Sequence, residues 1–117
     1  MAFKVIVAGD RDFTDYEFVK EKLDFYLKDK TDIEIVCGKA RGVDTLGENY
    51  AKEKGYPIVE FPADWDKYKL AAGPIRNGQM ADYADACIAF LASHSRGTKD
   101  MIRQAKKKGL SLRIVNI

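Results

Sequence analysis

Three short loops of this sequence each place an arginine beside or near a glycine. They span residues 9–11, 39–44 and 93–98, and each follows an apolar run. A guanidinium binds phosphate through paired hydrogen bonds, and a helix N-terminus adds free amides and partial positive charge. Glycine also lets the backbone approach a ligand closely. Together the loops predict a site for an anionic, phosphorylated ligand, although any one of them is equally typical of surface salt bridges and tight turns.

A long connection over residues 62–77 adds polar and aromatic side chains. Long loops in compact domains are often functional. Trp65 could stack on a base or pack as a hydrophobic plug, and Asp64 could accept ribose hydroxyls or remain a solvated turn residue. Arg76 and Asn77 could complete an anion site. We expect this connection to form one wall of the ligand site.

Asp44 is the most interesting carboxylate in the sequence and a weak candidate for catalysis. It follows Arg41-Gly42 at the start of a helix, where it could cap the helix, hold a ribose or act as an acid or base. A lone histidine such as His94 is more often a surface residue, and no Ser-His-Asp arrangement is evident. The catalytic group, if there is one, therefore stays unknown.

The expected ligand contacts combine these loops and the long connection. They are Gly9, Arg11, Gly38, Arg41, Gly42, Asp44, Asp64, Trp65, Arg76, Asn77, Ser95, Arg96, Gly97 and Thr98.

Strands and helices alternate along the chain and would position these residues. Short β-rich runs predict strands over residues 4–8, 33–37, 57–61, 86–91 and 112–115. Helical periodicity predicts four helices: one after a capping box at Thr14, one over residues 43–54 stopped by Gly55, one beginning at Pro74, and one capped by Thr98 that ends at Gly109. This alternation predicts a doubly wound α/β fold, with a mostly parallel sheet of about five strands and helices on both faces.

Composition limits the remaining possibilities. The 117 residues suffice for a single domain over residues 1–117, and 20 basic against 18 acidic residues create no chain-wide field for nucleic acid or an anionic membrane. Cys37 and Cys87 lie in apolar runs, which favours free buried thiols over a disulfide. Neither has a nearby zinc-ligand partner, so we expect no metal and no resident cofactor. No signal peptide or membrane span is evident, which predicts a cytoplasmic protein.

Five segments in order resemble the motifs of a known family. They lie at residues 7–13, 38–44, 62–66, 72–77 and 95–98, and they are similar to the serial motifs of the YspA/YpsA-related branch of the SLOG superfamily. The resemblance covers nearly the whole chain. It implies a Rossmann-like, three-layer domain whose relatives bind nucleotides, nucleotide-derived signals or, in DprA-type proteins, single-stranded DNA.

The same resemblance bears on catalysis. LOG phosphoribohydrolases, the enzymatic branch of the superfamily, carry a G-G-x-G-T-x-x-E pattern after the fourth strand. Here Gly97 and Thr98 match in part, but Met101 occupies the glutamate position. Asp44 or Asp100 would have to replace that carboxylate.

Three functions follow, in order of preference. The first is a binding or sensing module for a nucleotide or an NAD-related small molecule. The second is a nucleotide N-glycosidase or phosphoribohydrolase. The third is a DprA-like single-stranded DNA-binding module, which the balanced charge disfavours. Self-association into a homo-oligomer is compatible with the Tyr- and Leu-rich helices.

Overall fold

Five parallel strands form the centre of the structure, a computed structural model that describes residues 1–117. They are β1 (Phe3–Gly9), β2 (Ile33–Cys37), β3 (Ile58–Glu60), β4 (Ala86–Leu91) and β5 (Ser111–Asn116). Their order across the sheet is β3-β2-β1-β4-β5. The chain moves outward from β1 to β3 and then returns to the other side of β1, so the order reverses between β1 and β4. The predicted doubly wound sheet is confirmed.

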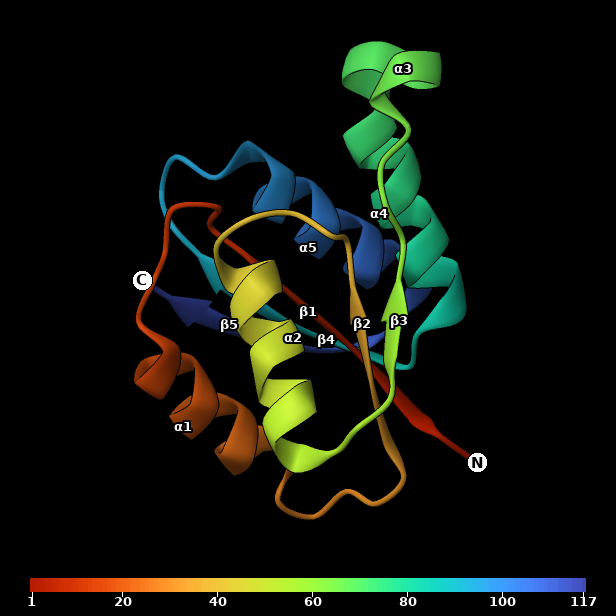
Figure 1. Ribbon diagram of the computed structural model, residues 1–117. Coiled ribbons are helices and arrows are strands. Elements are labelled where there is room, and N and C mark those ends of the chain that lie inside the picture. Colours follow the sequence, from red (N-terminus) through yellow and green to blue (C-terminus); the bar gives the residue numbers. More distant parts are fainter.

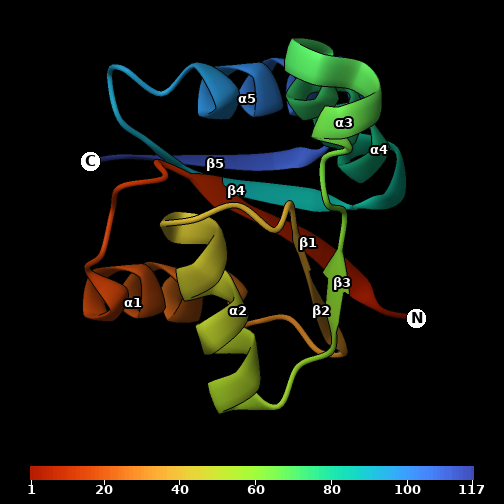
Figure 2. The same ribbon diagram turned by 45° about the horizontal axis from the view of Figure 1, so that its top comes forward.

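Helices cover both faces of the sheet. They are α1 (Tyr16–Leu27), α2 (Val43–Lys54), α3 (Trp65–Tyr68), a 3-10 turn η1 (Lys69–Ala71), α4 (Ala72–Tyr83) and α5 (Arg96–Lys108). Figures 1 and 2 show α1 and α2 on one face and α4 and α5 on the other, which makes three layers. None of the helices is long and apolar enough to cross a bilayer.

Alternation along the strands divides the core into two clusters. Val5 and Val7 of β1 face the cluster beneath α1 and α2, whereas Ile6 and Ala8 face the cluster beneath α4 and α5. Successive side chains of a strand point to opposite faces, so a nearly continuous apolar run is the pattern of a strand covered on both sides. The two-sided core holds the carboxyl ends of β1 and β4 in fixed register.

Three predicted helix starts are wrong. The N-cap of α1 is Asp15, whose carboxylate accepts a hydrogen bond from the Phe18 amide, so the capping box at Thr14 does not form. The N-cap of α5 is Ser95, and Thr98 lies inside the first turn. α4 begins at Ala72, which places Pro74 at the third helical position, where the proline's missing amide costs no intrahelical hydrogen bond.

Other predictions are confirmed or extended. The bounds of β2, α2 and β4 agree with the prediction, and Gly55 and Gly109 end their helices in left-handed conformations. Cys37 and Cys87 are free and buried. The short α3 and η1 were not predicted.

Candidate functional site

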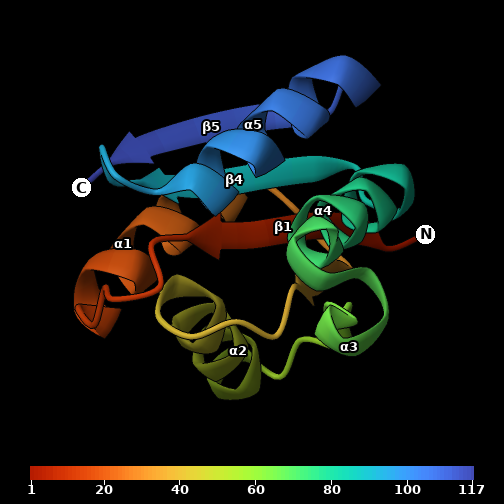
Figure 3. The same cartoon turned by 90° about the horizontal axis from the view of Figure 1, so that it is seen from above.

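The site lies at the carboxyl edge of the sheet, where β1 and β4 end side by side. In open α/β sheets a crevice for ligands forms where the strand order reverses. Gly9 at the end of β1 pairs with Phe90 of β4, and the chain then leaves in opposite directions toward α1 and α5. Figure 3 shows these connections and the start of α2 gathered at one edge.

Asp10 joins the three loops at this edge. Its Oδ1 accepts a hydrogen bond from Ser95 Oγ at 3.0 Å and lies 3.1 Å from His94 Nε2. Its Oδ2 accepts the Asp12 amide at 3.2 Å, and its carbonyl accepts the Val43 amide at 3.1 Å. Only 7% of Asp10 is exposed. Asp10 is not among the site residues predicted from the sequence, because a single carboxylate after a strand gains these partners only where β1 and β4 are neighbours.

Two of the expected site glycines allow the loops to approach one another. Gly42 has a φ of 69°, and an added Cβ would collide with the carbonyl oxygen of Asp10 and the backbone of Arg11. A Cβ on Gly9 would lie 2.7 Å from the Phe90 carbonyl oxygen. The space beside both glycines is thus filled by the protein's own backbone. Gly97, by contrast, faces open space.

The N-terminus of α5 is open. Its N-cap residue, Ser95, makes no capping hydrogen bond, and the Ser95 hydroxyl donates to Asp10. The amides of Gly97 and Thr98 have no acceptor within the protein, and the first turn holds no acidic residue. Thr98 itself is buried, whereas Gly97 is exposed. Free amides at a helix N-terminus favour an anion.

Exposed arginines surround this helix start. Arg11, Arg41 and Arg96 are all exposed, one on each of the three loops. Arg41 lies 3.7 Å from Asp12 in a pair that is about 70% exposed on both sides, and such pairs contribute little. Arg11 and Arg96 make no ion pair. All three guanidinium groups are therefore available to a ligand.

Arg76 differs from these arginines. It donates hydrogen bonds to the Gly38 carbonyl and, through Nε, to Asn77 Oδ1 at 3.0 Å. Burial lowers the pKa of Arg76, and neighbouring Asp44 opposes that change. Asn77 in turn donates to Asp100 at 2.9 Å and to the Gly97 carbonyl at 3.3 Å. Arg76 and Asn77 hold the loops after β2 and β4 against α4.

Asp44 lies beneath the loop that follows β2. Its Oδ2 accepts the amides of Gly38 at 3.1 Å and Ala40 at 3.3 Å, and 6% of the residue is exposed. Burial raises the pKa of Asp44 to about 6, although these amides and Arg76 favour the charged form. The carboxyl group thus fixes the conformation of this loop and titrates close to neutral pH.

A separate pocket of about 210 Å³ lies between the long connection and α4. Asp64, Tyr68, Arg76 and Gln79 line it together with Pro62, Ala72 and Ile75. Trp65 is 55% exposed and does not line the pocket, so it is not a hydrophobic plug.

The expected residues therefore form two groups. One group lies at the carboxyl ends of β1, β2 and β4 and comprises Gly9, Arg11, Arg41, Gly42, Ser95, Arg96, Gly97 and Thr98. The other lies toward α4 or beneath the loop after β2 and comprises Gly38, Asp44, Asp64, Trp65, Arg76 and Asn77.

One group of side chains has the composition of a metal site. Ligand atoms of Asp10, Asp12 and His94 lie within 4.8 Å of one another. No metal site is expected from the sequence, because only the fold brings these three residues together. Both oxygens of Asp10 already accept hydrogen bonds within the protein, and Asp12 and His94 are exposed.

The position of the LOG glutamate lies away from the crevice. Met101 is 1% exposed and packs in the core cluster that contains Ile6 and Met80. Asp100, a suggested replacement, accepts hydrogen bonds from Asn77, Gln104 and Arg103 between α4 and α5.

Comparison with known proteins gives three matches. The sequence model of the YspA, cpYpsA-related SLOG family matches residues 3–68, a range that contains the loops after β1 and β2. The chain is 31% identical over 114 residues to the Gene 61 protein of Mycobacterium phage D29, covering 92% of this chain and 91% of that protein. The fold is similar to that of DNA processing protein A (DprA) from Streptococcus pneumoniae, with a TM-score of 0.76 and 20% identity. That match covers 95% of this chain and 49% of DprA, so the chain spans about half of DprA's length.

Proposed function

The chain belongs to the YspA, cpYpsA-related SLOG family, and we propose that it binds a nucleotide or nucleotide-derived small molecule, such as an NAD-related compound, as a binding or sensing module. One observation carries this proposal. The uncapped start of α5 lies at the strand-order reversal with the exposed Arg11, Arg41 and Arg96 around it. Free amides and exposed guanidinium groups at one edge of the sheet form an arrangement suited to phosphate.

The two parts of the site suggest how such a ligand would lie. Its phosphate would accept hydrogen bonds from the amides of Gly97 and Thr98 and pair with the three arginines. Its base would extend toward the pocket beside α4, where Asp64 and Tyr68 offer a carboxylate and an aromatic ring. Trp65 is exposed nearby and would be available for stacking.

A thermal-shift panel of nucleotides tests this proposal, together with analysis of nucleotides that co-purify. A ligand at one hundred times its Kd stabilises the native state by about 2.7 kcal/mol. In a domain of this size that corresponds to a rise in Tm of roughly 10 °C. Arg41→Ala and Arg96→Ala should each remove most of the rise.

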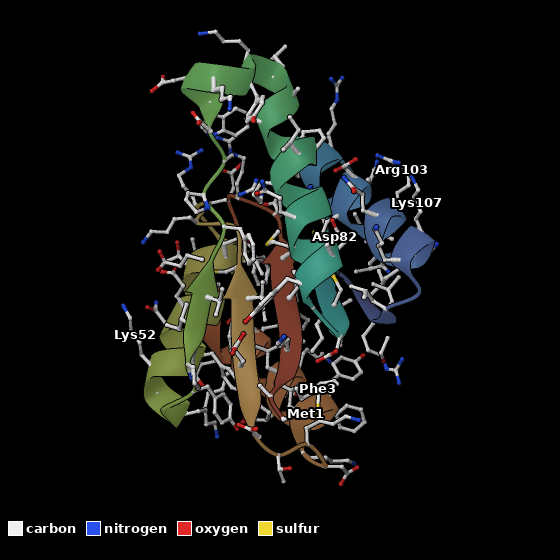
Figure 4. The ribbon with its side chains drawn as sticks, turned by 90° about the vertical axis from the view of Figure 1, so that its right-hand side faces the viewer. Met1, Phe3, Lys52, Asp82, Arg103 and Lys107 are labelled. Carbon is white, nitrogen blue, oxygen red and sulfur yellow. The ribbon has the colours of Figure 1, made fainter.

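Arg103→Ala is the matched control. Arg103 also lies on α5 and is exposed, but it lies beyond the first turn of the helix, near Lys107, and pairs with Asp100 (Figure 4). It should leave the ligand-induced rise unchanged. If no phosphorylated compound raises the Tm, or if the two crevice variants behave like Arg103→Ala, the proposal is wrong.

A nucleotide N-glycosidase is the second candidate, and the raised pKa of Asp44 supports it. A carboxyl group with a pKa of about 6 can donate or accept a proton near neutral pH. Released base would be measured from nucleoside monophosphates and from NAD, and Asp44→Asn should abolish the release. A broad substrate panel without any release would exclude this activity.

Single-stranded DNA binding is the third candidate, and it must be distinguished from nucleotide binding and from N-glycosidase activity. It predicts a steep dependence of affinity on salt concentration. Fluorescence anisotropy with labelled oligonucleotides measures this directly, and a flat response would exclude it. The near-balanced charge of the chain supports the nucleotide over the DNA strand.

Self-association remains a proposal with a specific surface. Trp65, Leu70 and Ile75 are exposed apolar residues on the segment from α3 to α4. Sedimentation velocity of the wild type and of Leu70→Lys tests whether this surface joins two copies.

A further inference from the structure

The pocket between the long connection and α4 is lined by side chains of both charges. Its volume is about 210 Å³. Pockets for drug-sized ligands measure about 300–1,000 Å³, so this pocket suits one part of a nucleotide, such as its base. Arg76 and Asp64 both line it, yet they form no ion pair with each other. Both charges are thus open to a ligand in the pocket.

Arg76 supplies hydrogen-bond donors to this pocket. Two of its guanidinium nitrogens are engaged, because Nε donates to Asn77 and Nη1 donates to the Gly38 carbonyl. Nη2 makes no hydrogen bond within the protein, and no carboxylate pairs with this half-buried guanidinium group. A partly buried cation is stabilised by a partner that accepts hydrogen bonds. Arg76 therefore favours an acceptor atom on the ligand.

Asp64 supplies an acceptor to the same pocket. Its Oδ1 accepts the Lys67 amide at 3.1 Å and so caps α3, whereas its Oδ2 makes no hydrogen bond within the protein. A carboxylate repels an anion, so a free inorganic anion would suit Arg76 but not Asp64. The group that fits this pocket must therefore combine acceptor atoms with N–H donors.

Guanine is the base with this combination. Its O6 and N7 atoms are acceptors, and its N1–H and N2 amino groups are neighbouring donors that a carboxylate can bind. In adenine N1 is an acceptor, which a carboxylate repels, and uracil has only one ring N–H donor. The acceptor and donor edges of guanine lie on different sides of the ring, which matches two charged groups that do not pair. The ring of Tyr68 also lines the pocket and is available for stacking.

We propose that this pocket binds a guanine base, with Asp64 accepting from N1–H and the N2 amino group and Arg76 donating to O6 or N7. The inference rests on the proposed function and names the base of its nucleotide. It selects guanine nucleotides over adenine nucleotides, and NAD belongs to the latter.

Calorimetric titration with GMP, IMP and AMP tests this selection. The three compounds share the same ribose and phosphate, so differences in Kd report on the base alone. GMP should bind about tenfold more tightly than AMP, which is the lower end of the discrimination that a paired contact to a base provides. IMP keeps N1–H but lacks the N2 amino group, so its Kd should lie between the other two.

Asp64→Asn tests the residue that carries the selection. Asparagine is as good an N-cap as aspartate, so α3 should be retained. Its amide presents N–H donors in place of the free carboxylate oxygen, and the preference for GMP over AMP should disappear. Asp66→Asn is the matched control, because it removes the same charge from an exposed position of α3 that does not line the pocket. In that variant the tenfold preference should remain.

The results separate this inference from nucleotide binding itself. Equal affinities for GMP and AMP, or a preference that survives Asp64→Asn, would overturn the guanine pocket and leave nucleotide binding intact. Loss of the preference in Asp66→Asn as well would also overturn it, since the effect would then come from charge at any position of α3. If none of the three compounds binds, the inference is wrong, and the thermal-shift panel decides independently whether another nucleotide is the ligand.

Discussion

Replacing Asp44 with asparagine should stabilise the protein at neutral pH. Burial raises the pKa of Asp44 from 3.8 to about 6, so the native state binds the proton more tightly than the unfolded chain does. A carboxyl group shifted in this direction destabilises the fold as pH rises from about 4 to about 6. The difference of about two pKa units corresponds to about 3 kcal/mol above pH 6. Asparagine keeps an oxygen for the amides of Gly38 and Ala40 without carrying the charge.

Urea denaturation of wild type and Asp44→Asn between pH 3.5 and 8 measures this effect. The two proteins should have the same free energy of unfolding below pH 4, and the variant should be about 3 kcal/mol more stable above pH 6. In a domain of this size the variant's Tm at pH 7 should be higher by roughly 10 °C.

Asp100→Asn provides a control of opposite sign. Burial opposes ionisation of Asp100, but hydrogen bonds from Asn77, Gln104 and Arg103 outweigh it and lower its pKa. That variant should lose stability at neutral pH and approach the wild type in acid. If Asp44→Asn is less stable than wild type at pH 7 and the gap closes in acid, the pKa of Asp44 is depressed and the reasoning is wrong.

Three further substitutions or measurements test other parts of the structure. Gly42→Ala should lower the free energy of unfolding by about 3 kcal/mol, because Gly42 has a positive φ and an added Cβ would collide with the backbone of Asp10. Gly109 also has a positive φ but faces open space, so Gly109→Ala should cost only about 1 kcal/mol in the same urea assay. Met101→Glu should destabilise the fold by more than about 3 kcal/mol and release no base from nucleotides, because it places a carboxylate in the core; a stable, active variant would contradict the placement of Met101. Cys37 and Cys87, whose pKa values burial raises to about 12, should react with Ellman's reagent at pH 8 only as the protein unfolds, and rapid labelling without denaturant would contradict their burial.

The sequence predicts the fold well because its signals are local. Gly55 and Gly109 end helices by the left-handed conformation that glycine adopts readily, and apolar runs mark the buried strands. The start of α1 was misplaced by one residue because Thr14 and Asp15 are adjacent cap candidates, and only the three-dimensional backbone selects between them. The four-residue α3 was missed because a single turn is too short to show periodicity.

The candidate site was predictable only in part, because its geometry depends on strand order. Local signals identify Arg11, Arg41 and Arg96, since arginine before or after glycine in a loop can be seen in the sequence. Arg76 also lies near glycines in the sequence, yet its guanidinium group contacts the carbonyl of Gly38, which is 38 residues earlier. Asp10 meets Ser95 across 85 residues. Such long-range contacts form because β1 and β4 lie side by side in the sheet, and hydrophobic periodicity does not reveal which strands are neighbours.

Asp10 connects the three loops at the carboxyl edge of the sheet, so these loops should tolerate changes in length less well than the segment from α3 through η1. The loops after β1, β2 and β4 all bond to this one residue, so altering the length of any of them would disturb the other two. The segment from α3 through η1 bonds to none of these loops and packs against α4. Substitutions from α3 through η1 should therefore leave the conformation of the loops after β1, β2 and β4 unchanged.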